Sequence, residues 1–314
     1  MKFIRPLVLC YLSCVPVLAA AGVDKNLPLP KDTPDAKELA EQVYFANHFY
    51  AFRNFSIGRR SGQEMAVLIN RDSGGKITRT GVERHLNNGY ANEAVKARDL
   101  SIFRSGNLRG SGMLVTEYSD DAKSNDYVMW IPALRKVRRF AQPDYKELWG
   151  GSVFTFGDVT LRKPMHETHE LLGTATFEDC LGAVKLEESD KNKYMQDLPT
   201  AACEHKGKKV YKLKSTTKFK NWWYDYRISY VDTKTFADYR TEYFKNDKKI
   251  KVIDRDWGTL GLDDPRALKW NYWYGTTLAT GHETWAVIPP SVVRFNEDLD
   301  PDLWSESTLR KIKR

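Results

Sequence analysis

The most chemically suggestive run in the chain places two histidines and two glutamates within five residues. This run is His166-Glu167-Thr168-His169-Glu170. A zinc-protease helix carries His, Glu, two further residues and then the second His, so here the second histidine comes one residue too early. On a strand, residues three apart point to opposite faces and their imidazoles cannot share a metal ion, whereas on a helix they can. The spacing therefore favours a polar, partly exposed strand over a metal site.

Two pairs of adjacent aspartates are the other carboxylate clusters that suit acid–base chemistry. Asp120-Asp121 and Asp263-Asp264 stand among Ser, Gly and Pro residues, which is typical of turns. The nucleophile-elbow, phosphate-loop and dinucleotide-binding glycine motifs are absent from the sequence. We therefore predict a protein that is not an enzyme and needs no metal or cofactor. An enzyme acting on lipid or glycan stays open only if His166 or His169 proves essential for turnover.

The first 21 residues have the charge and hydropathy order of a secretory signal peptide. Lys2 and Arg5 precede an apolar stretch, and small residues follow it up to Ala21. The apolar stretch is shorter than the ~20 residues that a membrane span needs. We expect cleavage after Ala21, with cleavage after Ala19 as an alternative, and export to a bacterial periplasm. A lipoprotein anchored through Cys14 and a buried N-terminal helix are the other interpretations.

The two cysteines that remain after the leader are Cys180 and Cys203. An even pair in an oxidising compartment indicates a disulfide, which here would close a polar loop. In the chain-entropy model, closing a loop of this size is worth ~3 kcal/mol. Two buried thiols are the alternative, and a metal site built on this pair alone is not expected.

One basic cluster stands out in a chain whose formal net charge is +8, or +6 once the leader is removed. It is Arg135-Lys136-Val137-Arg138-Arg139. Because an exported protein rarely meets nucleic acid, we expect no nucleic-acid partner. Arg135, Lys136, Arg138 and Arg139 are candidate contacts for anionic lipid headgroups or an acidic partner protein. A solvated hairpin of mixed charge is the alternative.

Hydrophobic residues make up 41% of the chain and aromatic residues 12%, which excludes a disordered protein and favours strands. Capping residues at 32–35 and apolar residues at steps of three and four predict an amphipathic helix from Ala36 to about Arg53. A second, weaker helix is expected over 92–99. We divide the mature chain into residues 22–100, with a leader, the helix and first strands, and residues 101–314, the remainder of one β domain with a charged tail.

From about Ser101 to Val293 the chain is expected to consist of short strands separated by turns. Many strands without alternating helices indicate an antiparallel sheet or barrel. The clearer strands in this stretch are 112–118, 126–131, 153–156, 169–177, 209–216 and 222–231, followed by 239–243 and a hairpin at 246–248. A short strand-like run at 66–69 precedes the stretch.

The strand at 222–231 carries the strongest alternation. One face holds Trp222, Tyr224, Tyr226, Ile228 and Tyr230, and the other face is of mixed polarity. The alternation predicts a strand with one apolar and one mixed side.

Two segments carry a family resemblance. Asp-Tyr-Val-Met-Trp-Ile-Pro-Ala-Leu-Arg-Lys-Val-Arg-Arg-Phe begins at Asp126, and Trp-Gly-Gly-Ser-Val-Phe-Thr-Phe-Gly-Asp begins at Trp149. Together with the aromatic strand at 223–232 and Leu303-Trp304 near the end, they resemble the LolA-like outer-membrane lipoprotein-sorting family, in its longer branch associated with RND-type exporters. The chain departs from the family where Val153 stands in place of an expected Asp, which puts one shared polar interaction in doubt.

The resemblance implies a mainly β fold, with a curved antiparallel sheet that forms an incomplete, open β-barrel closed by α-helices. Its concave face would bind a lipid, a lipoprotein acyl chain or another hydrophobic molecule. A barrel filled by its own aromatic side chains is the alternative. The residues we expect to line the cavity are Trp130, Phe154, Phe156, Tyr224, Tyr226 and Tyr230.

We therefore predict a periplasmic carrier that makes transient membrane contact and works with an inner-membrane RND-type transporter. The alternative is a sensor or scaffold that uses the same fold to bind a lipoprotein or a transporter without moving cargo. A carrier would retain a ligand on purification, whereas a sensor would instead hold a stable protein partner.

Overall fold

The computed structural model describes residues 22–59, 65–90, 94–190 and 202–312, so the expected leader at 1–21 lies outside the described residues. The strands in chain order are β1 (Asn54–Ile57), β2 (Ala66–Arg71), β3 (Ile77–Asn87), β4 (Val95–Phe103), β5 (Gly112–Tyr118), β6 (Asp126–Ile131), β7 (Lys136–Phe140), β8 (Glu167–Thr176), β9 (Lys209–Thr217), β10 (Tyr226–Asp232), β11 (Asp238–Lys245), β12 (Lys248–Thr259), β13 (Leu268–Thr277), β14 (His282–Val287) and β15 (Val293–Phe295). The helices are α1 (Ala36–Asn47) and α2 (Glu306–Arg310), with a π-helical turn η2 (Gly157–Leu161) and the 3-10 turns η1 (Trp149–Gly151), η3 (Pro164–His166), η4 (Glu188–Asp190), η5 (Pro290–Val292) and η6 (Pro301–Trp304).

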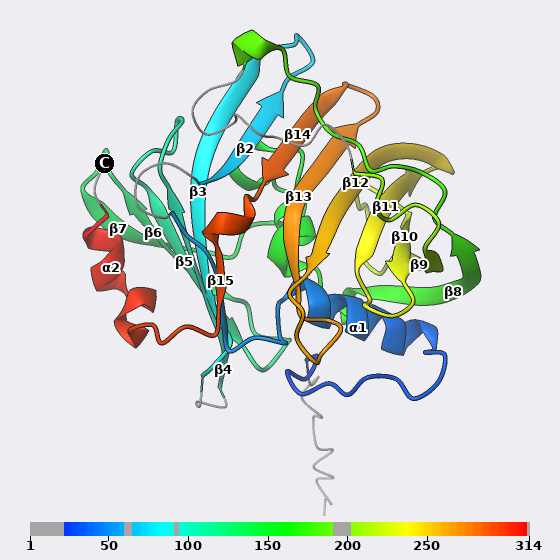
Figure 1. Ribbon diagram of the computed structural model, residues 1–314. Helices are drawn as coiled ribbons and strands as arrows, with labels where there is room; N and C mark the ends of the chain where they lie inside the picture. Colours follow the sequence, from blue (N-terminus) through cyan, green and yellow to red (C-terminus); the bar gives the residue numbers. More distant parts are fainter. Residues whose placement is uncertain (1–21, 60–64, 91–93, 191–201, 313–314) are drawn as a thin grey trace, which may run out of the picture.

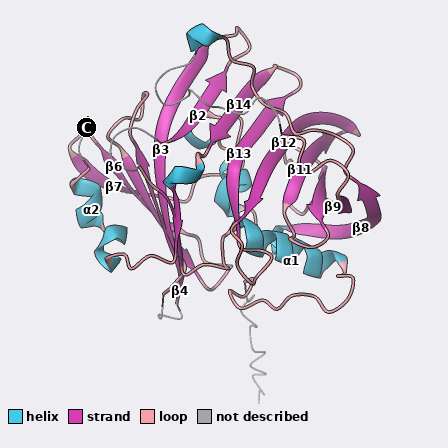
Figure 2. Cartoon of the chain, in the orientation of Figure 1, coloured by secondary structure: helices cyan, strands magenta, loops and turns pink. Residues whose placement is uncertain are grey.

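All of these strands belong to one antiparallel, curved sheet (Figures 1 and 2). The main path runs β7-β6-β5-β4-β3-β2-β14-β13-β12-β11-β10-β9-β8, and β1 pairs with β3 and β15 beside it. β7 and β8 are the two ends of this path and do not pair with each other, so the sheet is open. The predicted mainly β fold with an unclosed antiparallel sheet is confirmed.

Local turn chemistry explains where several strands reverse. Asn246 and Asp247 both have positive φ, 49° and 57°, and form the two-residue loop between β11 and β12. Asn and Asp tolerate this left-handed conformation, which matches the twist of the flanking strands. The hairpin predicted at 246–248 is therefore confirmed.

α1 begins and ends with recognisable signals. The side chain of Asp35 accepts a hydrogen bond from the backbone N–H of Glu38 at 2.8 Å, which caps the first turn. The helix ends at Asn47, earlier than predicted, because Phe49 adopts a left-handed φ of 54° and stacks on Phe55 with ring centroids 4.0 Å apart. Within the described ranges, no helix is both long enough and apolar enough to cross a bilayer.

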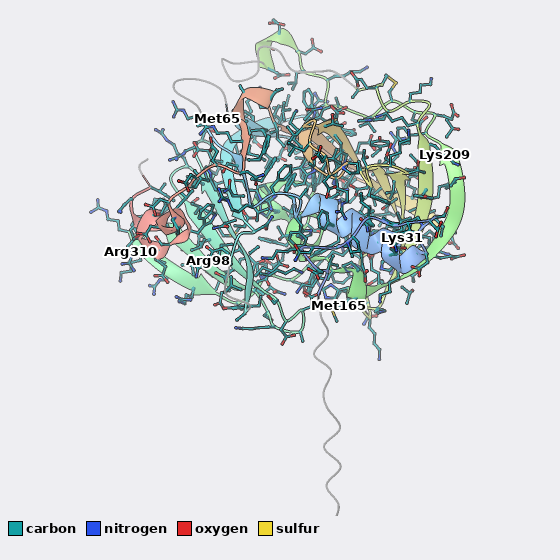
Figure 3. All side chains as sticks on the ribbon, turned by 60° about the horizontal axis from the view of Figure 1, so that its bottom comes forward. Lys31, Met65, Arg98, Met165, Lys209 and Arg310 are labelled. Carbon is teal, nitrogen blue, oxygen red and sulfur yellow. A yellow bond between two sulfur atoms is a disulfide. The ribbon has the colours of Figure 1, made fainter. Side chains whose placement is uncertain are left out.

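α1 lies across the end of the sheet formed by β8, β9 and β10. Leu39 and Ala40 are buried against Tyr211, Leu213 and Val231 of β9 and β10. Figure 3 shows this end of the molecule, with Lys31 before α1 and Lys209 at the start of β9, while Arg98 and Arg310 mark the opposite end. The helix therefore covers one side of the curved sheet, which we call the inner face.

Three of the expected elements are wrong in type or extent. Of the second helix expected over 92–99, residues 92–93 lie outside the described residues, and residues 95–99 are not helical but begin β4, which pairs with β3 on one side and β5 on the other. This pairing on both edges overrides a weak local helix preference. Residues 153–156 form no sheet strand, and β10 begins at Tyr226 rather than Trp222.

Residues 149–161 instead cross the inner face of the sheet, and we call them the inner segment. Leu148 and Thr155 form an isolated β-bridge at its base. Val153 is buried, and its backbone N–H donates to Oγ1 of Thr284 on β14 at 2.9 Å. At this position, where the family resemblance expects Asp, the side chain packs in the apolar core.

The close approach of the inner segment to the sheet depends on Gly275 of β13. A Cβ atom at this position would lie 2.7 Å from both the Val153 and the Phe154 side chains. We expect Gly275→Ala to lower the free energy of unfolding by about 1–3 kcal/mol, because the segment would have to shift outward. Urea unfolding measures this loss. Gly74→Ala, in the open turn between β2 and β3, is the matched control and should change stability little; equal losses in both variants would contradict this account.

The opposite, outer face of the sheet is covered by two other segments. The chain after β8 crosses it, tied by the predicted disulfide between Cys180 and Cys203, which is confirmed. At the other end of the sheet, the C-terminal segment packs Trp304 and Leu309 against β4, β5 and β6. Trp304 is buried, and its indole N–H donates to the carbonyl oxygen of His85 at 2.8 Å.

Candidate functional site

An apolar cavity of about 80 Å³ lies between the inner segment and the concave sheet. The inner segment contributes Trp149, Phe154 and Val159, and the sheet contributes mainly aliphatic and indole side chains. Its lining consists of Ile57, Ala66, Val67, Leu68, Val82, Arg84, Trp149, Phe154, Val159, Trp270, Trp273, Ala286, Val287 and Ile288. The charged member, Arg84, is paired with Asp99 at 2.7 Å. The exposed lining is therefore apolar and suits a hydrocarbon ligand.

The floor of this cavity is formed by two tryptophans of β13. Trp270 and Trp273 contact each other edge to face at 4.8 Å between ring centroids, and Phe154 meets Trp273 in the same way at 5.3 Å. These contacts fix the shape of the cavity by ring geometry rather than by hydrogen bonds.

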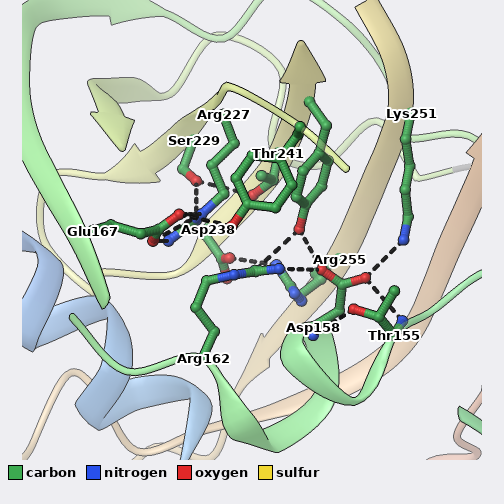
Figure 4. A network of polar contacts seen from close by, with 12 residues as sticks. Thr155, Asp158, Arg162, Glu167, Arg227, Ser229, Asp238, Thr241, Lys251 and Arg255 are labelled. Carbon is green, nitrogen blue, oxygen red and sulfur yellow. Dashed lines mark hydrogen bonds and ion pairs between the residues drawn. The ribbon is translucent and has the colours of Figure 1, made fainter. Parts of the chain in front are cut away.

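A second, polar cavity of about 60 Å³ lies beside the first, between α1, the inner segment and strands β8 to β12. Asp158, at the start of η2, is buried and lines this cavity, and Figure 4 shows the polar contacts that it makes. Its carboxylate accepts hydrogen bonds from Lys251 Nζ at 2.7 Å, Arg162 Nη2 at 2.7 Å and the Tyr243 hydroxyl at 2.6 Å. One carboxylate thus joins the inner segment to β11 and β12.

The electrostatics of Asp158 follow from these partners. Burial acts to raise the pKa of the carboxyl, but the charges of Lys251 and Arg162 outweigh burial and hold the pKa well below its ordinary value. Burial lowers the pKa of the Lys251 ammonium, and Asp158 opposes that shift. At 2.7 Å from the carboxylate, we take Lys251 to be charged at neutral pH.

A second ion pair extends the network to β8 and β10. Arg227 contacts Glu167 through Nη2 at 2.6 Å and through Nε at 3.0 Å, and the Tyr224 hydroxyl donates to the same carboxylate at 2.9 Å. Burial acts to raise the pKa of Glu167, but Arg227 lowers it to about 2. Ser229, two residues after Arg227 on the same strand, accepts a hydrogen bond from Arg227 Nη1 at 3.1 Å.

A third ion pair, between Arg255 of β12 and Asp238 of β11, completes the cluster drawn in Figure 4. Asp238 also accepts a hydrogen bond from the Asn47 side chain of α1 at 3.0 Å. The guanidinium of Arg255 lies 4.0 Å from the ring centroid of Trp273. Arg255 therefore connects the polar cluster with the aromatic floor of the apolar cavity.

The structure separates the six residues expected to line one cavity. Phe154 lines the apolar cavity, whereas Phe156 packs beside it on Tyr127 and Tyr145. Tyr224 belongs to the polar network through its bond to Glu167.

The remaining three expected residues lie on the other side of the sheet. Tyr226 stacks on Phe244 and its hydroxyl donates to Asp247 at an exposed site. Tyr230 contacts Phe177 of the segment that crosses the outer face. Trp130 packs in the cluster that holds Trp304.

The histidine run forms no shared site. Both ring nitrogens of His169 are used, since Nε2 donates to the Pro164 carbonyl and Nδ1 accepts from the Ser215 hydroxyl, each at 2.9 Å. His166 Nδ1 accepts from the Lys163 backbone N–H at 3.2 Å, and burial lowers the pKa of His166 to about 4. Across the described ranges, no three His, Cys, Asp or Glu side chains gather as a metal site.

The basic cluster forms the β6–β7 hairpin at one end of the sheet. Arg135 lies in the turn with φ 50°, and Leu134 beside it is 53% exposed. Arg139 is paired with Glu306 of α2 at 2.6 Å. Arg135, Lys136, Arg138 and Arg139 thus lie on an exposed edge, away from both cavities.

Sequence reasoning missed the polar network. Asp158, Arg162, Lys251 and Arg255 lie in different parts of the chain, and only the fold brings them together. A usable signal was present in β12, where Lys251, Asp254 and Arg255 interrupt an apolar strand pattern. Charged residues inside such a strand indicate buried pairs or a functional site.

A family model described as "Uncharacterized protein" matches residues 96–197, which is less than half of the chain. No curated protein sequence matches the chain.

Three solved structures share the fold. A DUF1329 family protein from Desulfovibrio piger aligns with a TM-score of 0.64 at 16% identity, over 88% of this chain and 100% of that one. A protein domain assigned to outer membrane lipoprotein sorting, from Vibrio parahaemolyticus, aligns with a TM-score of 0.63 at 14% identity, over 88% of this chain and 98% of that one. A LolA superfamily protein from Nitrosomonas europaea aligns with a TM-score of 0.50 at 11% identity, over 88% of this chain and 99% of that one. This chain therefore has the LolA-like fold that the sequence resemblance predicted.

Proposed function

We propose that this protein is a periplasmic carrier that holds the apolar part of a lipid, a lipoprotein acyl chain or another hydrophobic molecule. The observation that carries the proposal is the apolar cavity on the concave face of an open, LolA-like sheet. Each Å² of apolar ligand surface removed from water there contributes ~25 cal/mol. The leader expected at residues 1–21 supports a periplasmic location for the mature protein.

Loading a long chain requires the cavity to widen. Its volume of about 80 Å³ is below the ~300–1,000 Å³ of typical ligand sites. Trp149, Phe154 and Val159 all come from the inner segment, so outward movement of this one segment would enlarge the cavity. Its attachment to the sheet, through Asp158 to Lys251 and through the Val153 N–H to Thr284, sets how readily it moves.

Transient membrane contact belongs to the same proposal. The exposed β6–β7 hairpin carries Arg135, Lys136 and Arg138 around Leu134, a combination that suits an anionic lipid surface. Cargo would be received from an inner-membrane transporter of the RND type. The chemistry of this carrier involves binding and release only.

The direct test is native mass spectrometry of protein purified from periplasm without detergent, followed by organic extraction. An apolar adduct near one per chain is the expected result. A clean mass with a stable protein partner would instead favour the sensor or scaffold function, for which the small size of the cavity is the supporting observation.

Filling the cavity should block binding. Ala286 of β14 lines it opposite Trp273, and a phenylalanine there would occupy the free space. We expect Ala286→Phe to weaken binding of the neutral dye N-phenylnaphthylamine by about tenfold or more, since each 1.4 kcal/mol is a factor of ten. Fluorescence titration measures the affinity. Ala279→Phe, in the exposed turn of the same hairpin, is the matched control; equal dye binding by Ala286→Phe and the control would refute this cavity as the binding site.

A further inference from the structure

The apolar and the polar cavity are neighbours. Val159 of the inner segment lines both. Trp273 lines the apolar cavity, and Arg255, which lies over the Trp273 ring at 4.0 Å, lines the polar one. Val159 and the Arg255–Trp273 contact therefore lie at the boundary of the two cavities, so a chain that filled the first cavity and extended past Val159 would approach the guanidinium of Arg255.

The polar cluster has more positive than negative charge. Its cations are Arg162, Arg227, Lys251 and Arg255, and its anions are Asp158, Glu167 and Asp238. One positive charge is thus unbalanced in a site that is largely removed from water. A buried charge without a counter-charge is costly, and a bound anion would remove that cost.

The groups around this cluster do not supply the missing negative charge. Lys163, which also lines the polar cavity, is paired with Asp121 at 2.9 Å. His48 and His169 are neutral at pH 7, because burial lowers the pKa of His169 and brings that of His48 to about 4.

Arg255 is a member of the cluster with a buried donor that no protein acceptor uses. Its side chain is 5% exposed, and within the described part of the chain its Nε–H has no hydrogen-bond partner. Asp238 contacts Nη1, and that carboxylate is shared with Asn47. A guanidinium has five N–H donors in a planar fork, so it can hold Asp238 and a second oxyanion together.

We infer that the ligand of this protein is an anionic amphiphile, whose carboxylate or phosphate head lies at Arg255 while its hydrocarbon chain fills the apolar cavity. This inference rests on the proposed carrier function and specifies the class of cargo. The head would complete the charge balance of the cluster, and Trp273 would lie at the boundary between head and chain.

The test compares ligands of equal chain length, dodecanoate, dodecyl phosphate and dodecanol, as competitors of N-phenylnaphthylamine at pH 7 on the wild-type protein. We expect either anion to bind about tenfold or more tightly than the alcohol, as a charge-assisted hydrogen bond predicts. Arg255→Gln should bring the three affinities together. Arg240→Gln is the matched control, because Arg240 of β11 is paired with Asp254 at 2.7 Å and lines neither cavity, so this variant should retain the preference.

The outcomes separate this inference from the carrier function. Equal wild-type affinities for alcohol and anions would overturn the inference and leave the carrier standing, whereas no binding of any of the three would overturn both. Protection against unfolding by inorganic phosphate alone, as strong as that by dodecyl phosphate, would indicate a free-anion site and also overturn it. If Arg255→Gln does not fold, the wild-type comparison decides by itself.

Discussion

Replacing Asp158 with asparagine is expected to lower the free energy of unfolding by about 3–5 kcal/mol, the usual loss when one partner of a buried ion pair is removed. The variant keeps the size of the side chain but leaves Lys251 and Arg162 without the carboxylate that both contact at 2.7 Å. It also weakens the attachment of the inner segment to β11 and β12. Urea unfolding at pH 7 measures the loss.

A double variant distinguishes stranded charge from lost packing. Adding Lys251→Met to Asp158→Asn removes one of the two stranded cations while keeping an unbranched side chain. The double variant should be more stable than Asp158→Asn alone, because the unpaired ammonium is the costly part. If the double variant is instead less stable than Asp158→Asn alone by a similar further amount, the stability comes from packing around these side chains and not from charge pairing.

The parts of this fold that sequence could predict are those decided by neighbouring residues. The cap of α1 at Asp35 and the tight turn at Asn246-Asp247 each depend on a few consecutive side chains. The strand at β10 was also evident from alternation. Such local signals give the kind of element and the class of fold.

The inner and outer faces of β10 could not be told apart in this way. Both faces are covered, since α1 and the polar network lie on one side and the segment carrying Phe177 lies on the other. The aromatic side of β10, with Tyr226 and Tyr230, therefore has the composition expected of a cavity lining, but it lies on the outer face of the sheet. Alternation shows that a strand has two faces, and only the long-range packing shows which one encloses the site.

The polar network escaped prediction for a related reason. Lys251 and Asp158 are 93 residues apart. Asp158 has a local partner in Arg162, four residues further on, but this spacing is also that of ordinary exposed helical pairs and does not mark the carboxylate as buried. The charges of Lys251 and Arg255 within the apolar pattern of β12 indicate burial, but they do not show which residue supplies the counter-charge. The identity of that counter-charge depends on how the inner segment crosses the sheet, which here required the glycine at 275.

The second large effect is a loss of folding stability at low pH, which we expect to come from Glu167. The Glu167 carboxyl has a pKa of about 2 in the folded protein against 4.5 in the unfolded chain. A lowered folded-state pKa means that the stabilisation is complete above about pH 4.5 and is lost as the pH falls toward about 2. The full difference corresponds to about 3 kcal/mol, at 1.36 kcal/mol for each pKa unit. About 2 kcal/mol of this should already be lost at pH 3.

Comparison with Glu167→Gln isolates this one group. His48, whose pKa burial lowers to about 4, also protonates as the pH falls, but it is common to both proteins and cancels in the difference. Burial is the largest cause of the lowered pKa values of His166 and His169, and the charge of Glu167 is a lesser one that opposes it. The stability gap between wild type and variant should therefore be largest at pH 7 and shrink by about 2 kcal/mol at pH 3. Glu170→Gln, on the exposed side of the same strand, should show no gap at either pH. A gap for Glu167→Gln that stays constant from pH 7 to 3 would mean that Arg227 does not hold this carboxyl in its charged form, and that the network is bound by hydrogen bonds to neutral groups instead.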